Sequence, residues 1–407
     1  MATKLIGNAV VGQSGGPTAA INATLAGVIR GVKENVHDGS IGTLYGMRNG
    51  VEGLLEERLV DLTEYFADDA LITKLENTPA AALGSCRKKL PKAHEGNEVY
   101  EKLLSIFKKY NIRYFFYIGG NDSADAARIV AEEAEKEGYP LIVYHIPKTI
   151  DNDLRSCDHT PGFGSAARFV ASAIRGDDLD NRALGGVKID VIMGRDAGFL
   201  TAASALARIR EDDGPHLIYL PEVVFTEEKF IKDVKAALKK YGRCVCAVSE
   251  GIRGKDGIPI GAKLGSGETD SHGNVQMSGT GALGDALATL LKSKAGVKRV
   301  RADTFGYLQR SFPGIASKVD QAEGRAAGEA AVKAALKGEL TKGTIAIVRE
   351  EGKKYKIAYA PVPIQNAAKY TRSVPKEYIA KNGHDVTEAF LEYVRPIVGD
   401  IPHCEIF

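Results

Sequence analysis

The chain of 407 residues lacks the features that would place it in a membrane or an oxidising compartment. No apolar run approaches the roughly 18 residues that a membrane-spanning helix needs. Its five cysteines are an odd number and too sparse for a disulfide scaffold, and no signal peptide opens the chain. A formal charge of +2 excludes a global attraction to nucleic acid or acidic membrane. We therefore expect a soluble cytoplasmic protein whose thiols are buried and reduced.

Several common ligand-binding motifs are also missing. The chain contains no G-x-x-x-x-G-K-[ST] phosphate loop, no dinucleotide G-x-G-x-x-G and no H-E-x-x-H metal motif. Cys244 and Cys246 would share one face of a strand, but no partner ligands stand at metal-site spacing. His145 lies inside an apolar run, so we expect a core histidine whose hydrogen bonds are satisfied.

Strand and helix patterns alternate along the chain, and the length favours two domains. We predict strands at 8–11, 113–118, 141–146, 188–192, 216–220 and 244–248. Helices are predicted at 19–36, 123–138, 165–174, 198–209 and 227–240. A surface excursion is expected over 254–281, and a β-hairpin from 344–348 and 355–359. Repeated βα units indicate an α/β protein with two Rossmann-like, three-layer domains and mostly parallel sheets.

The most informative segment, 147–153, packs two carboxylates and a lysine into one turn after the apolar run 141–146. In open α/β folds, ligands bind at the carboxyl ends of such strands. One carboxylate can accept a proton from an attacking hydroxyl, while the other helps to hold Mg²⁺. Lys148 adds a compact positive charge for phosphate oxygens. A turn or capping role accounts for one acid, but not for two acids with a preceding lysine.

A similar layout occurs about thirty residues earlier, where the run 114–118 leads into Gly119-Gly120-Asn121-Asp122-Ser123. A turn that uses Asn and Asp for local hydrogen bonds is the alternative interpretation. Gly15 and Gly16 stand between the first strand and a helix, where backbone amides favour an anion, although a plain tight turn also accounts for them. Together these strand ends offer the backbone amides, carboxylates and lysine that are typical of phosphoryl transfer with a bound divalent metal.

The second half of the chain adds cations at the ends of strands. Arg195 follows the strand 188–192, so its guanidinium can grip a phosphate through two hydrogen bonds. Glu250 ends another strand and can hydrogen-bond sugar hydroxyls, while Arg301 and Arg310 form a second basic pair. A solvated arginine and a surface or capping acid are the alternatives for these positions.

These motifs, in this order, resemble the phosphofructokinase family from residue 12 to about residue 328. The motifs specific to that family are Gly119-Gly120-x-x-Ser123, Thr149-Ile150-Asp151-Asn152-Asp153, Met193-Gly194-Arg195 and Gly306-x-x-Gln309-Arg310. The resemblance implies an active site in the cleft between the two domains. It also implies reversible, Mg²⁺-dependent phosphorylation of fructose 6-phosphate to fructose 1,6-bisphosphate by a homodimer or homotetramer.

The resemblance further implies how the chain divides between the two substrates. The phosphoryl-donor domain would comprise 1–162 and about 309–360. The sugar-phosphate domain would comprise 163–308 and about 361–407, with a long excursion at about 254–298.

The same resemblance implies a role for each matching residue. Asp151 and Lys148 would be catalytic, and Asp153, Asn121 and Asp122 would form the metal site. Donor binding would involve Gly15, Gly16, Arg87, Asp122, Ser123 and Lys148. Sugar phosphate would contact Thr149, Asp151, Met193, Gly194, Arg195, Glu250, Arg301, Tyr307 and Arg310. Of these, Arg301 would reach the 6-phosphate from a neighbouring subunit.

Two positions divide the family by phosphoryl donor. ATP-dependent members usually carry glycine where this chain has Asp122 and Lys148. A carboxylate at Asp122 fills space and repels the α-phosphate of a nucleotide, whereas pyrophosphate ends before that point, and Lys148 supplies charge to the shorter donor. The pair therefore resembles the pyrophosphate-dependent members.

Three alternatives are an ATP-dependent enzyme, a non-catalytic regulatory subunit, and a lipid or NAD kinase. The intact acids Asp151 and Asp153 speak against the second, and the Met193-Gly194-Arg195 motif disfavours the third. The chain departs from the family at Asn121, where most members have an acid. Lys188 also lies about two positions away from the family's other cross-subunit arginine.

Overall fold

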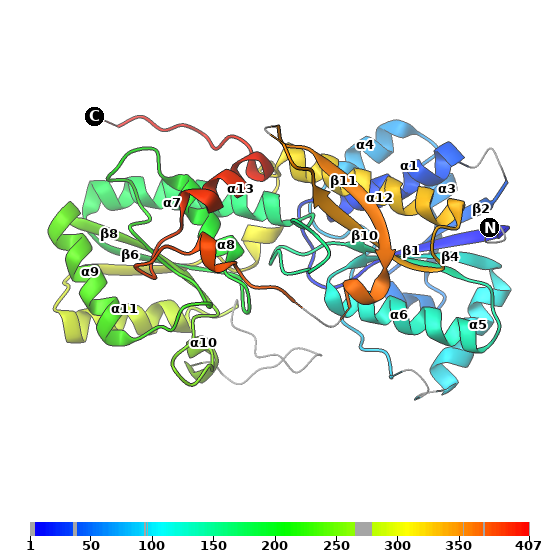
Figure 1. Cartoon of the computed structure of the whole chain (residues 1–407), viewed down its shortest axis with the longest axis horizontal. Helices are drawn as coiled ribbons and strands as arrows, with labels where there is room; N and C mark the ends of the chain where they lie inside the picture. The colour runs from blue at the N-terminus through cyan, green and yellow to red at the C-terminus, as the bar shows by residue number, and fades with distance from the viewer. Residues whose placement is uncertain are drawn as a thin grey trace. The chain divides into compact units, whose positions relative to one another are not determined.

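The computed structural model describes residues 5–35, 39–92, 95, 97–264, 279–352, 354–368 and 371–406. The chain divides into two compact units (Figure 1). Unit 1 comprises Met1–Gly162 and Asp320–Thr371, and unit 2 comprises Phe163–Val319 and Arg372–Phe407. The chain thus returns to unit 1 at residue 320 and leaves it at 371, later than the approximate bounds of 309 and 360. The return at residue 320 coincides with helix α12 (Lys318–Lys337), whose alanines belong to the core of unit 1.

Unit 1 is built on a seven-stranded sheet with the order β11-β10-β5-β4-β1-β2-β3. Its strands are β1 (Gly7–Gln13), β2 (Ile41–Met47), β3 (Leu59–Asp61), β4 (Ile112–Gly119), β5 (Ile142–Pro147), β10 (Lys342–Arg349) and β11 (Ile357–Pro363). The inner pairs are parallel, and only the edge strands β3 and β11 run antiparallel to their neighbours. Strands β4 and β5 are almost continuously apolar because helices cover both of their faces.

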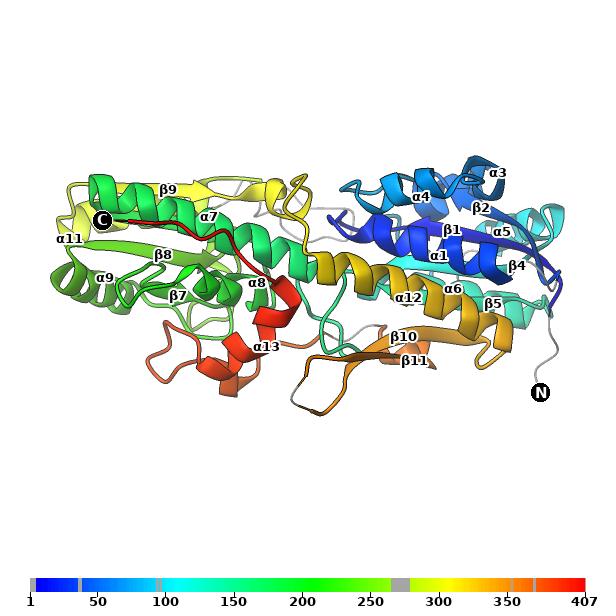
Figure 2. The same ribbon diagram turned by 90° about the horizontal axis from the view of Figure 1, so that it is seen from above.

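Helices α1 (Ile21–Asn35), α3 (Leu62–Tyr65), α4 (Asp69–Glu76) and α12 cover one face of this sheet. The other face is covered by α2 (Gly50–Leu55), α5 (Asn97–Lys109) and α6 (Asn121–Lys136). Helices α1 and α12 lie side by side (Figure 2). Their close approach depends on Gly27 and Gly328, because a Cβ at either position would overlap backbone atoms of the facing helix.

Unit 2 contains a smaller, fully parallel sheet with the order β7-β8-β6-β9. Its strands are β6 (Gly186–Ile192), β7 (Leu217–Tyr219), β8 (Arg243–Ser249) and β9 (Val300–Thr304). Its helices are α7 (Phe163–Leu184), α8 (Phe199–Ala202), α9 (Glu227–Tyr241), α10 (Ile260–Leu264), α11 (Ala282–Ala295) and α13 (Glu388–Val398). Helices α9 and α11 pack on one face of the sheet, so this unit also has the layered α/β architecture.

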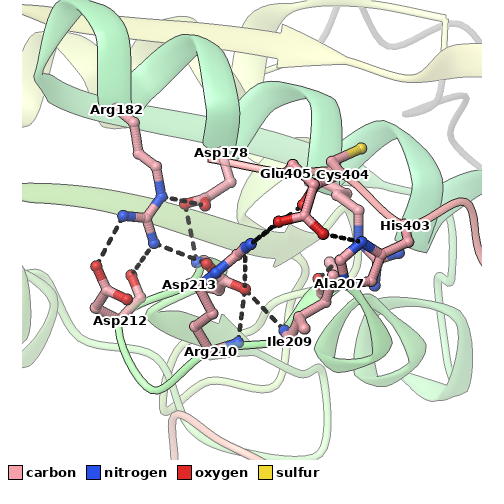
Figure 3. Close-up of polar contacts among 12 residues, drawn as sticks. Asp178, Arg182, Ala207, Ile209, Arg210, Asp212, Asp213, His403, Cys404 and Glu405 are labelled. Carbon is pink, nitrogen blue, oxygen red and sulfur yellow. Dashed lines mark hydrogen bonds and ion pairs between the residues drawn. The ribbon is translucent and has the colours of Figure 1, made fainter. Parts of the chain in front are cut away.

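Acidic and basic side chains hold the loop between α8 and β7 against α7 (Figure 3). Arg182 on α7 pairs with Asp212 and with Asp213, each at 2.7 Å. Burial opposes the charge of Asp213, but amide hydrogen bonds from Arg210 and Ile209 and the charge of Arg182 together lower the pKa of this carboxyl. These contacts fix the path of the chain into β7.

Most of the predicted elements are confirmed, with some corrections. All six predicted strands exist, and β10 and β11 form the antiparallel hairpin, although β11 begins two residues later than expected. The helix predicted over 198–209 is wrong in its length, because α8 gives way to a 3-10 helix at Ala203–Ala207. The excursion predicted over 254–281 contains α10, and its residues 265–278 lie outside the described residues.

Most of the cysteine side chains and the side chain of His145 are buried, as predicted. Four of the five cysteines are buried, Cys404 is half-buried, and all five are free thiols. His145 on β5 is fully buried, with Nδ1 2.8 Å from Thr344 Oγ1 and Nε2 2.8 Å from Gly119 O. Because a carbonyl only accepts, Nε2 carries the proton and Nδ1 accepts from the threonine hydroxyl. The prediction of a satisfied core histidine is confirmed.

Within the described ranges, every helix is too short or too polar to cross a bilayer.

Burial of His145 predicts a loss of stability in mild acid. Burial lowers the pKa of His145 to about 4, from an ordinary value of 6.5. The unfolded chain therefore binds a proton at this residue more readily, and stability falls as the pH decreases from about 6.5 towards 4. In thermal unfolding at pH 7 and pH 5, His145→Gln should lose less stability between the two pH values than the unmodified protein does. The exposed His403→Gln serves as the matched control; an unchanged pH dependence in His145→Gln would contradict the assignment.

Candidate functional site

The loop after β1 in unit 1 places two glycines beside a buried lysine. Gly15 adopts a left-handed φ of 76°, and its amide donates to Cys86 O at 3.1 Å. Lys148, only 3% exposed, donates from Nζ to Gly16 O at 2.7 Å. A Cβ at Gly15 would lie 3.4 Å from this ammonium nitrogen. The ammonium of Lys148, the residue after β5, thus places a positive charge against the glycine loop. Arg87, next to Cys86, is exposed.

The N-terminus of α6 lies at the end of the neighbouring strand β4. Gly120 is its N-cap and supplies no side-chain acceptor, so Asn121, Asp122 and Ser123 form the first helical turn. The backbone joins this turn to β5, since the Lys148 amide donates to Gly119 O at 2.9 Å. The N-terminus of a helix of 16 residues attracts an anion. The exposed Asp122 carboxylate adds negative charge to this turn.

The loop after β5 holds Asp151 and Asp153 on either side of a strained residue. Asn152 is fully buried with a φ of 57°, a conformation that asparagine tolerates better than most residues. Its side-chain oxygen accepts from the Thr160 amide at 3.1 Å, and the Thr149 hydroxyl accepts from the Asp151 amide at 3.2 Å. Asp151 and Asp153 remain half-buried. This backbone fixes two carboxylates on one short turn.

A second group of predicted residues meets at the carboxyl ends of β6 and β8 in unit 2. The Gly194 amide lies 3.4 Å from Glu250 Oε1, and the Glu250 amide donates to Ile192 O at 2.8 Å. The amide of Met193 donates to the side chain of Gln309 at 3.2 Å. Glu250, Met193 and Gly194 are therefore neighbours, as a common ligand would require.

Arg195, Tyr307 and Arg310 extend this group. The Arg310 guanidinium lies 4.5 Å from the centre of the Tyr307 ring, an arrangement that orients both side chains. Arg195 is half-buried, and its carbonyl accepts from Arg253 at 3.0 Å. The Arg310 side chain is thus held against Tyr307, and the backbone at Arg195 is held by Arg253.

The sequence prediction missed two positioning residues in this set. Gln309 is 2% exposed and links the Met193 amide to Gly306 O, to which it donates at 2.7 Å. Its place in the Gly306-x-x-Gln309-Arg310 motif was the available signal. Arg253 pairs with Asp196, and no local pattern indicates that contact.

Arg301 is not brought to this end of the sheet within its own chain. It is the second residue of β9, level with Lys188 of β6, and it is exposed. It therefore lies three residues, or about 10 Å, before the last residue of the strand. This separation is compatible with a role towards another subunit.

Three acids of unit 2, Asp177, Asp190 and Asp303, lie close enough to hold a cation and were not predicted to do so. Lys188 already supplies positive charge there, because its ammonium pairs with Asp303 and lies 3.4 Å from Asp177. Burial raises the pKa of Asp190 well above its usual range. The cluster is thus an ion-pair network with its own cation, whereas the predicted metal ligands Asn121, Asp122 and Asp153 lie in unit 1.

The chain is similar to known proteins over most of its length. The profile described as phosphofructokinase matches residues 8–335. The chain is 51% identical to the pyrophosphate–fructose 6-phosphate 1-phosphotransferase of Rhodospirillum rubrum, covering 97% of this chain and 94% of that protein. The protein of the same name from Halomonas elongata is 39% identical, over 96% and 91% of the two chains.

The fold is also similar to that of a solved structure. The crystal structure of the pyrophosphate-dependent phosphofructokinase of Nitrosospira multiformis matches with a TM-score of 0.85 and 35% identity. The match covers 98% of this chain and 94% of the other.

Proposed function

The chain belongs to the phosphofructokinase family, and on that basis we propose that it phosphorylates the 1-hydroxyl of fructose 6-phosphate with pyrophosphate. The product is fructose 1,6-bisphosphate, and the reaction runs in both directions. The observation that carries the choice of donor is the pair Asp122 and Lys148. One adds negative charge to the first turn of α6, and the other holds an ammonium against the glycine loop.

Unit 1 is proposed to bind the donor. Pyrophosphate oxygens would be held by the amides of Gly15, Gly16 and Ser123, by Arg87 and by the Lys148 ammonium. A nucleotide would extend an additional phosphate towards Asp122, where two anionic groups about 4 Å apart repel by several kcal/mol at an intermediate dielectric. This repulsion supports pyrophosphate over ATP.

The acids of the same unit fit a divalent cation. Asp153, Asp122 and the amide oxygen of Asn121 are the hard oxygen donors that Mg²⁺ prefers, and these residues would hold it. When bound, Mg²⁺ neutralises charge on the phosphate oxygens.

Asp151 is proposed as the base that accepts the proton of the 1-hydroxyl. The carboxylate is half-buried and is fixed by the turn that includes Asn152. Phosphoryl transfer depends mainly on positioning and charge neutralisation, so the proton is accepted late, as the new P–O bond forms.

Unit 2 is proposed to bind the sugar phosphate. Glu250 would hydrogen-bond hydroxyl groups, and Arg195 and Arg310 would bind the 6-phosphate, with contacts from Met193, Gly194 and Tyr307. Thr149 of unit 1 would add a contact near the reacting hydroxyl. Arg301 would complete the phosphate site of a neighbouring subunit, so the active protein is proposed to be a homodimer or homotetramer.

Removal of the proposed base should lower turnover while preserving binding. Asp151→Asn should reduce kcat by about 10² or more, the usual scale for a general base. Calorimetry should still detect fructose 6-phosphate binding of similar affinity. The exposed Asp180→Asn is the matched control for loss of one negative charge. Near-normal turnover in Asp151→Asn would refute the role.

Arg301 can be tested by mixing two inactive variants. Arg301→Ala alone should lose affinity for fructose 6-phosphate, and Asp151→Asn alone should lose turnover. If Arg301 serves the neighbouring site, a mixed dimer has one complete site, and random mixing should restore roughly a quarter of the unmodified activity. Hybrids are confirmed by two affinity tags and mass measurement. Hybrids without recovered activity, or a fully active monomer in sedimentation, would contradict the shared site.

Asp122 and Lys148 should together decide the donor. Asp122→Gly should allow detectable ATP use because space and charge are relieved, while Lys148→Gly should mainly lose pyrophosphate turnover. The double variant should favour ATP more than either single change, since neighbouring sites couple. The measurement is kcat/KM with each donor for all four proteins. Undetectable ATP use in Asp122→Gly would place donor choice at other residues.

A further inference from the structure

The turn that carries Asp151 and Asp153 is held by the returning part of the same loop. The Thr149 amide donates to Pro161 O at 3.2 Å, and the Thr160 hydroxyl donates to Thr149 O at 2.8 Å. The Thr160 amide donates to the side chain of Asn152, the residue between the two acids. The position of Thr160 therefore determines how the turn presents both carboxylates.

His159, next to Thr160, lies between two carboxylates. It is 1% exposed, with Nδ1 2.8 Å from Asp158 Oδ2 and Nε2 2.5 Å from Glu323 Oε2. A carboxylate only accepts, so both ring nitrogens must carry protons to satisfy both contacts. A neutral ring would direct one lone pair at a carboxylate oxygen. The geometry alone thus selects the imidazolium form of His159.

Two groups of the hairpin formed by β10 and β11 hold these two acids. Arg349, at the end of β10, pairs with Asp158 at 3.0 Å. Tyr355, between β10 and β11, donates its hydroxyl to Glu323 on α12 at 2.6 Å. The Arg349 guanidinium also lies 4.9 Å from the centre of the Tyr355 ring. His159 therefore links the loop that carries Asp151 and Asp153 to helix α12 and to the hairpin of β10 and β11.

The charges of this cluster balance only when His159 is protonated. Two carboxylates, Asp158 and Glu323, face two cations, Arg349 and the His159 imidazolium. Burial opposes the charge on the ring, but the hydrogen bonds to Asp158 and Glu323 outweigh it and raise the pKa of His159. Burial also raises the pKa values of Tyr355 and of Tyr359 on β11. Among these facing groups, His159 is thus the one whose pKa is raised from the range of an ordinary imidazole.

We propose that His159, as an imidazolium between Asp158 and Glu323, is a positioning residue that fixes the turn bearing Asp151 and Asp153. The inference rests on the proposed function, because those two carboxylates are the base and the metal ligand of that reaction. His159 touches neither substrate. It acts through Thr160 and Asn152, so its loss should misplace the base while the donor loop at Lys148 and the sugar-binding residues of unit 2 stay intact.

The first test separates turnover from binding. His159→Gln should lower kcat roughly 10- to 100-fold, the scale expected when a catalytic group is misplaced by about 1 Å. The KM values for pyrophosphate and fructose 6-phosphate should change much less than kcat. The exposed His403→Gln should behave like the unmodified protein. A His159→Gln protein with unchanged kcat between pH 6 and pH 9 would overturn the inference.

The second test concerns the charge of the ring. In the unmodified protein kcat should fall at alkaline pH as His159 loses its second proton, and the ¹⁵N resonances of the imidazole should titrate at the same pH. In Glu323→Gln a neutral ring can accept from the new amide while donating to Asp158, so this alkaline fall should disappear. Glu323→Asp keeps the carboxylate and should keep the fall.

Failure of the positioning role can be distinguished from failure of the proposed function. An unmodified protein without pyrophosphate-dependent turnover rejects the function itself. An active protein whose pH profile is identical in Glu323→Gln and Glu323→Asp rejects only the charged positioning role. If His159→Gln does not fold, the pH dependence of kcat in Glu323→Gln decides whether the positioning role holds.

Discussion

Unit 1, the proposed donor-binding unit, depends on one constraint, the parallel alignment of β1, β4 and β5. Parallel strands end at the same edge of the sheet, so residues far apart in sequence meet there without any long excursion of the chain. The amide of Lys148 binds Gly119 O, and its ammonium binds Gly16 O, which joins three strand ends through one residue. The glycine loop, the first turn of α6 and the acidic turn after β5 take their places from this alignment.

In unit 2, parallel strands also bring polar side chains together at one edge of the sheet, but these side chains differ in chemistry. Its strand ends carry Glu250, Arg195 and Arg310 instead of two acids and a lysine. Gln309 connects two of its segments by satisfying the Met193 amide and a carbonyl of its own turn. Arg301, placed earlier on β9, is the exception to this clustering, and for that reason its proposed role lies outside its own chain.

The local sequence was sufficient for the parts of the structure that depend on local pattern. Apolar runs predicted β4 and β5 closely, and the polar residues after them lie at the carboxyl ends of these strands, as expected. Residues whose position depends on distant contacts were missed. His159 meets Glu323 across 164 positions of sequence, and no periodicity or turn signal indicates that pairing. The resemblance did imply that the chain returns to the first unit from about residue 309, but the close approach of Gly27 and Gly328 in the pair of helices α1 and α12 was not predicted, because it depends on distant contacts.

The most direct test of the account is a comparison of phosphoryl donors with the unmodified protein. Purified protein is supplied with fructose 6-phosphate and Mg²⁺, together with either pyrophosphate or ATP, and formation of fructose 1,6-bisphosphate is followed. The arrangement of Asp122 and Lys148 predicts rapid turnover with pyrophosphate, release of pyrophosphate from the reverse reaction with phosphate, and little or no turnover with ATP. A clear preference for ATP would contradict the assignment of the donor site.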